Sequence, residues 1–254
     1  MEATNIKLNS TIEHVISSLF VKALRDDASI AIWRRPESPL VEVILDKDPG
    51  GYKSPLNDLD RLPAGFMIHP FKSSENHPPY YIKASSYYSF SLKENTTEAF
   101  EEILAPDSAA SSTEDLAFEI RSFINNSFAK TASTTTKKSC FLATVEKAIA
   151  AINSGELYKV VPAKVKRIEL PANFDLASVF LSLCDAYPSA FINCFYSEKT
   201  GFWLGASPET LIKTKGDNFF TMALAGTQKA KGENPLKNAA WTQKEIEEQA
   251  LVSR

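Results

Sequence analysis

Apolar residues in the first half of the chain recur at helical spacing and then at strand-like spacing. Ile12, Ile16 and Leu19 are separated by three or four positions, which predicts an amphipathic helix. Short apolar runs bounded by Pro, Gly and Asp predict strands after it. The elements predicted here are a helix over about 10–25, strands at 29–33, 41–45, 64–69 and 80–90, and helices at 96–104 and 114–125.

The second half alternates helices and strands more regularly. Phe141, Val145 and Ile152 lie on one predicted helix face, and Asn173 or Asp175 can cap a helix that ends before Pro188. The elements predicted here are a helix at 141–152, a strand at 157–165, the capped helix, strands at 190–196, 201–206, 211–213 and 218–224, and a helix from about 235 onward. The series predicts an α+β fold with largely antiparallel sheets and helices packed on their outer faces.

A polar run rich in Thr, Ser and Lys separates the two halves, and no side chain in it can anchor a core. We therefore predict an N-terminal α+β region over 1–130, a polar linker or loop over 131–139, and a second region over 140–254.

Composition narrows the classes of function. The net charge is −3, from 28 basic and 31 acidic residues, and no basic cluster indicates nucleic acid or an anionic membrane surface. The apolar stretches are shorter than the roughly 20 residues that a membrane helix needs. The 3 cysteines lack metal-type spacing, and the N-terminus lacks the pattern of a signal peptide, so a cytoplasmic location is predicted.

Two ionisable residues lie in or beside apolar strand-like segments. Lys159 lies among Leu157, Val160 and Val161, and burial there would favour the neutral amine that a general base requires. The alternative is a lysine on the solvent side of an edge strand. Glu209 follows Ser-Pro at the end of a strand, where it is a candidate general acid or an ordinary turn glutamate.

Two further segments could hold a ligand. Residues Leu224, Ala225, Gly226 and Thr227 end a strand with small residues, which lets a ligand approach the backbone; the alternative is a simple turn. Glu245 and Glu248 are three positions apart on a predicted helix, so they share a face that could hold Mg²⁺, or they form a solvated face.

The four segments in this order resemble the motif series of the chorismate-utilising enzymes, and most closely the isochorismate synthases. The matching residues are Tyr158–Val161, Gly205–Glu209, Leu224–Thr227 and Lys244–Glu248. Residues 140–254 then correspond to the first part of the chorismate-binding catalytic region. Anthranilate synthases typically carry Gln where Lys159 stands, and aminodeoxychorismate synthases can carry a nucleophilic Lys where Ala225 stands.

The resemblance implies a mechanism in which Lys159 deprotonates a water that attacks C2 of chorismate, while Glu209 protonates the departing C4 hydroxyl. It implies Mg²⁺ held by Glu248, with Glu245 as a second acidic candidate, and substrate contacts from residues 224–227. Isochorismate feeds menaquinone, siderophore and salicylate synthesis.

The sequence is also compatible with three alternative functions, which are salicylate synthase, anthranilate synthase component I and a non-catalytic half-domain. Because family members continue beyond the fourth motif, the chain is expected to be an inactive fragment. Such a fragment would expose apolar surface, through which it could self-associate.

Overall fold

The computed structural model describes residues 11–48, 62–75, 77–93, 111–129, 135–229, 232–234 and 237–252. The helices are α1 (Ile12–Arg25), α3 (Thr113–Ala129), α4 (Lys138–Asn153), α5 (Leu176–Ala186) and α6 (Gln243–Val252). The strands are β1 (Ser29–Arg34), β2 (Leu40–Asp46), β3 (Gly65–Ile68), β4 (Tyr80–Lys83), β5 (Ser86–Ser91), β6 (Phe191–Ser197), β7 (Gly201–Ser207), β8 (Lys213–Lys215) and β9 (Asn218–Phe220). The helix predicted at 96–104 and residues 131–134 of the predicted linker lie outside the described residues.

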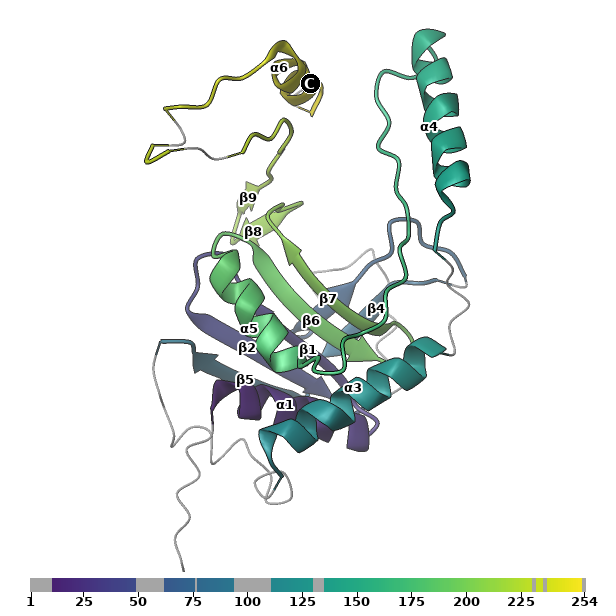
Figure 1. Ribbon diagram of the computed structural model, residues 1–254. Helices are drawn as coiled ribbons and strands as arrows, with labels where there is room; N and C mark the ends of the chain where they lie inside the picture. The colour runs from purple at the N-terminus through teal and green to yellow at the C-terminus, as the bar shows by residue number, and fades with distance from the viewer. Residues whose placement is uncertain are drawn as a thin grey trace, which may run out of the picture.

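An antiparallel five-stranded sheet in the order β5-β2-β1-β6-β7 organises the chain (Figure 1). Its centre joins the two halves of the sequence, because β1 pairs with β6 in a register that places Ile32 opposite Cys194. The predicted α+β class with antiparallel sheets is confirmed.

Helices α1, α3 and α5 cover one face of this sheet (Figure 1). The apolar face of α1, including Ile16 and Phe20, is completely buried against the sheet, and burial of each such side chain stabilises the fold by about 1.5–3 kcal/mol. Side-chain caps fix where two of the helices begin. Thr11 Oγ1 accepts the His14 N–H at 3.3 Å, and Asp175 Oδ1 accepts the Ser178 N–H at 3.1 Å, which confirms the predicted Asp175 cap.

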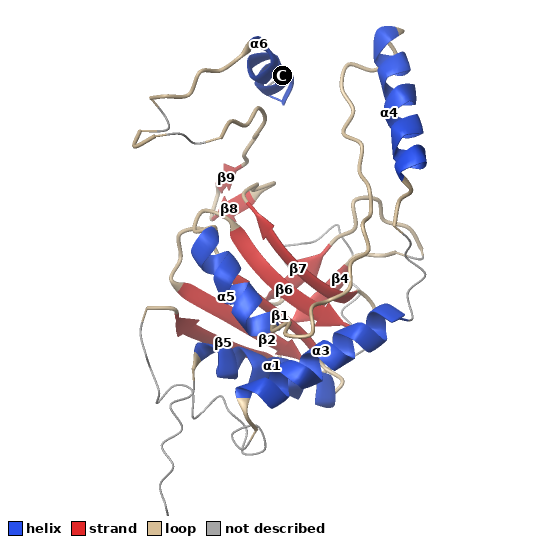
Figure 2. Ribbon diagram, viewed as in Figure 1, coloured by secondary structure: helices blue, strands red, loops and turns tan. Residues whose placement is uncertain are grey.

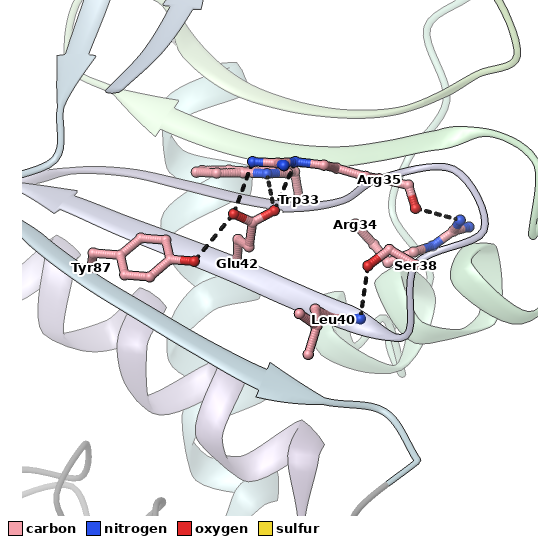
Figure 3. Close-up of polar contacts among 7 residues, drawn as sticks. All are labelled: Trp33, Arg34, Arg35, Ser38, Leu40, Glu42 and Tyr87. Carbon is pink, nitrogen blue, oxygen red and sulfur yellow. Dashed lines mark hydrogen bonds and ion pairs between the residues drawn. The ribbon is translucent and has the colours of Figure 1, made fainter. Parts of the chain in front are cut away.

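The other face of the sheet carries a smaller cluster with a polar network at its margin (Figure 3). Glu42, whose side chain is only 12% exposed, accepts hydrogen bonds from Trp33 Nε1 at 3.0 Å and from the Tyr87 hydroxyl at 3.2 Å. It also pairs with the Arg35 guanidinium at 2.9 Å. A carboxylate this well buried is tolerated because its oxygens are satisfied.

Arg34 points to the opposite side and is itself buried, with 2% exposure. Its guanidinium donates to Cys184 O at 3.3 Å and Tyr187 O at 2.6 Å, and also to Pro188 O. These carbonyls lie at the C-terminal end of α5, where a positive charge is favourable. Arg34 therefore fastens α5 to β1.

The strand predicted at 80–90 is wrong as a single element, because it divides into β4 and β5. Strand β4 pairs with β3 in a separate two-stranded sheet, whereas β5 pairs with β2. Asp46 stabilises the turn between β4 and β5, because its carboxylate accepts hydrogen bonds from the Lys83 N–H at 2.9 Å and from the Ser85 hydroxyl at 3.1 Å.

The remaining elements, which are α4, the β8–β9 hairpin and α6, extend away from the five-stranded sheet (Figure 2). The strand predicted at 157–165 is wrong, since this segment has no ladder partner among the described residues. At its end, the Val165 N–H donates to Thr136 Oγ1 and Val165 O accepts the Thr136 N–H. The strand predicted at 211–213 is displaced to β8, the strand predicted at 218–224 is the shorter β9, and the last helix begins later, at Gln243. Helix α4 forms as predicted, but none of its residues is buried.

Candidate active site

The first and fourth motifs meet through an ion pair. Lys159 lies on the irregular segment that follows α4, and Glu248 lies on α6, 89 positions later. Lys159 Nζ is 3.3 Å from Glu248 Oε1, and the two side chains are 35% and 36% exposed. Folding therefore brings together the base candidate and the metal-ligand candidate.

The apolar neighbours of Lys159 do not enclose it. Leu157 and Val160 are each 42% exposed, and Val161 is 79% exposed. The burial expected from the sequence pattern is therefore not present around this lysine, because the segment lies outside any sheet. The contact that positions the ammonium group is the one with Glu248.

The turn at 224–227 packs against the same helix. The Ala225 N–H donates to Gln249 Oε1 at 3.1 Å, and Gln249 Nε2 donates to Ala223 O at 3.4 Å. Gly226 adopts φ +69°, and a Cβ at this position would lie 2.8 Å from Glu245 O. Both the left-handed backbone and the close approach to α6 therefore require glycine.

Glu245 has a structural role at the start of α6. Its carboxylate accepts hydrogen bonds from the Thr242 N–H at 2.8 Å and from the Thr242 hydroxyl, and the first of these is the glutamate half of a capping box. These hydrogen bonds lower the pKa of Glu245 below its ordinary value, because they favour the ionised form. Gln228 Nε2 adds a contact at 3.5 Å. Glu245 is thus less available to a cation than Glu248 is.

Glu209 lies just beyond the end of β7 and is exposed. Its N–H donates to Ser207 Oγ at 3.3 Å. The segment after it runs beside the chain that leads to the 224–227 turn, since the Met222 N–H donates to Thr210 O at 3.1 Å. Lys159 and Glu209 both belong to the described part of the chain, and no ion pair joins them.

The donor set at α6 fits an open Mg²⁺ site. Within the described ranges, no three His, Cys, Asp or Glu side chains gather as a closed metal site. Mg²⁺, however, is commonly held by one or two carboxylates while it keeps several waters. The partly exposed carboxylate of Glu248 suits that mode, and Glu245 would add a second oxygen only by leaving its cap.

A hollow of about 640 Å³ lies elsewhere, beside the N-terminal end of α1 and the C-terminal end of α5. Arg34, Glu37 and Cys184 are among the residues that line it, and none of the four motifs contributes to it. Burial raises the pKa of the Cys184 thiol, so this thiol is a poor nucleophile. We place the candidate chemistry at the motif residues because their contacts bring distant segments together.

Two residues at the site were not predicted from the sequence. Gln249 has no local sequence signature that reveals its two bonds to the 223–225 backbone. Thr242 could have been found, because Thr242-Gln243-Lys244-Glu245 has the spacing of a capping box.

Comparison with known proteins identifies the family. The family model for chorismate binding enzymes matches residues 66–254, which include every motif residue described above. The chain therefore belongs to the chorismate-binding enzyme family. No curated protein and no solved structure matches the chain. Among the described residues, no helix has the length and apolar character needed to span a membrane.

Proposed function

We propose that this chain carries the chorismate site of an isochorismate synthase. The observation that carries the proposal is the contact of Lys159 with Glu248 beside the Ala225–Gly226 turn. These residues come from three separate motifs, and a base candidate, a cation-ligand candidate and a small-residue turn meet at one helix. The choice within the family rests on Lys159 and Ala225, because neither the glutamine of anthranilate synthases nor a nucleophilic lysine is present.

In the proposed reaction, chorismate binds with its ring near the turn. Lys159, as the free amine, takes a proton from a water that adds to C2. The ring double bonds shift, and the C4 hydroxyl leaves as water after accepting a proton from Glu209. The exchange is balanced, since one water enters and one departs.

Magnesium ion belongs to this proposal. Glu248 would hold it, and the ion when bound supplies positive charge that stabilises the substrate carboxylate. Glu248 cannot pair with Lys159 and bind a metal cation equally well. When a cation binds Glu248, Lys159 therefore loses its present ion-pair partner.

Solvent exposure of Lys159, Glu209 and Glu248 favours one second candidate, a protein that binds chorismate without transforming it. Charge stabilisation in a transition state is strongest where water is excluded. We therefore expect slow turnover in the conformation described. Binding and catalysis are separable, so each needs its own assay.

Product analysis tests the proposal. The purified chain is incubated with chorismate and Mg²⁺, with and without ammonium, and products are separated by liquid chromatography. Isochorismate, absent from the Lys159→Ala variant, supports the proposal. Salicylate or ammonium-dependent anthranilate would assign the chain to another branch of the family. Chorismate binding without any product would favour the second candidate.

A further inference from the structure

The outermost strand on one side of the five-stranded sheet is β7 (Figure 2). It has seven residues, Gly-Phe-Trp-Leu-Gly-Ala-Ser, and none is charged. One edge of β7 pairs with β6. Across the described ranges, no backbone hydrogen bond satisfies its other edge. A long apolar edge strand without lysine or proline inside it is a ready template for another strand.

The side chains on β7 make this edge self-complementary. Residues two apart share a face, so Trp203 and Gly205 lie on one face, and Phe202 and Ala206 lie on the other. If a second β7 runs antiparallel about a two-fold axis at Leu204, the two Leu204 side chains meet on the axis and each aromatic residue faces a small one. Trp203 then lies opposite Gly205 of the second copy, and Phe202 opposite Ala206 of the second copy.

The two faces of β7 have different surroundings. Phe202 and Leu204 pack on the helix-covered core, whereas Trp203 is 58% exposed and stacks on Phe195 with ring centroids 6.2 Å apart. Phe195 packs on one side of the Trp203 indole ring. The exposed surface of the indole can then cover the backbone at Gly205 of the second copy. Aromatic side chains stabilise glycine in sheets in this way.

We propose that two copies of this chain associate through antiparallel pairing of their β7 strands, centred on Leu204, which joins two five-stranded sheets into one. The occupant of the edge is a second copy because the large-to-small match arises from β7 paired with itself, as a two-fold interface requires. The pairing is independent of the chemistry proposed for the motif residues.

Substitution of Gly205 by lysine tests the pairing. A Cβ there would lie 3.6 Å from the nearest atom of Asn193, an ordinary contact, so the backbone at this position accepts a Cβ without a clash. The charge would stand where the second Trp203 must pack. Ser89→Lys provides the matched control, because Ser89 is exposed on β5, the strand at the opposite margin of the sheet.

Sedimentation velocity over a concentration series gives the readout, with circular dichroism to confirm folding. We expect a reversible dimer for the wild type and for Ser89→Lys, and a dissociation constant raised about tenfold or more for Gly205→Lys. If Gly205→Lys does not fold, Trp203→Ser takes its place with the same expectation. A wild type that stays monomeric, forms only larger aggregates, or keeps its dimer affinity in the edge variant would overturn the proposal.

Discussion

Lys159 Nζ lies 3.3 Å from Glu248 Oε1, a contact between the first and last motifs of the chain. The Glu248 side chain is 36% exposed, so the net contribution of the ion pair to stability is small, about 0.2–1 kcal/mol. The contact matters because Lys159 and Mg²⁺ would compete for the same carboxylate: Glu248 is both the proposed Mg²⁺ ligand and the partner of the proposed base.

Removal of the lysine should strengthen Mg²⁺ binding. In Lys159→Ala, Glu248 no longer has a competing cation, and the affinity should rise by up to about fivefold, the equivalent of an exposed ion pair. Isothermal titration with MgCl₂ measures the change. Lys164→Ala is the control, since Lys164 lies over the Phe141 ring and should leave the affinity unchanged. Unchanged or weaker binding in Lys159→Ala would argue against Glu248 as the ligand.

A methyl group at Gly226 should loosen α6. The added Cβ would lie 2.8 Å from Glu245 O, and the left-handed φ adds strain, so the contact should lose roughly 1–3 kcal/mol. Gly155→Ala is matched to it, because Gly155 has φ +80° with no atom near the added Cβ. Hydrogen exchange of the α6 amides should accelerate in Gly226→Ala only. Equal acceleration in both variants would mean that the turn does not hold the helix.

Acid should loosen the start of α6. The pKa of Glu245 is lowered in the folded state, so its cap contributes stability above the pKa of the unfolded chain. That contribution is lost as the pH falls through the lowered, folded value. The protection factor of the Thr242 amide, which is measured by NMR and corrects for the slower intrinsic exchange in acid, should therefore fall at pH values below the ordinary pKa of glutamate. The Glu245→Gln variant should show no such pH dependence, and a dependence that persists in it would contradict the cap.

Adjacent arginines should differ sharply in their effect on stability. Arg34→Ala removes a buried charged donor from the carbonyls at the end of α5, which should cost roughly 3 kcal/mol in the free energy of unfolding. Arg35 is 65% exposed, and Arg35→Ala should cost about 1 kcal/mol or less. Urea denaturation measures both. Equal losses would show that Arg34 does not fasten α5.

The sheet and its helices could be predicted from local patterns, and the site could be predicted only in part. Helix α1 has clear helical periodicity, β1 and β2 are short apolar runs between turn residues, and Asp175 is a residue type that caps helices. The 157–165 segment has strand-like composition but no neighbouring strand in the part of the chain that the structure describes, and a sequence alone does not supply the partner. For the same reason, the sequence indicated burial of Lys159, where the structure has an exposed ion pair.

Long-range side-chain contacts explain most of what the sequence did not reveal. In the sequence, Arg34 has no feature that distinguishes it from other charged residues at strand ends, yet the carbonyls that accept its hydrogen bonds lie about 150 positions away. Gln249 similarly acquires its role from a turn that lies 24 positions earlier in the chain. Neither partner set has a local signature.

The location of chorismate binding tests the central claim most directly. Amide shifts of the isotopically labelled chain are followed by NMR during titration with chorismate in the presence of Mg²⁺. We predict saturable shifts at Lys159, Ala225, Gly226 and Glu248, which weaken in Lys159→Ala. Shifts confined to the hollow beside Arg34, or no saturable shift at all, would contradict a chorismate site built from these motifs.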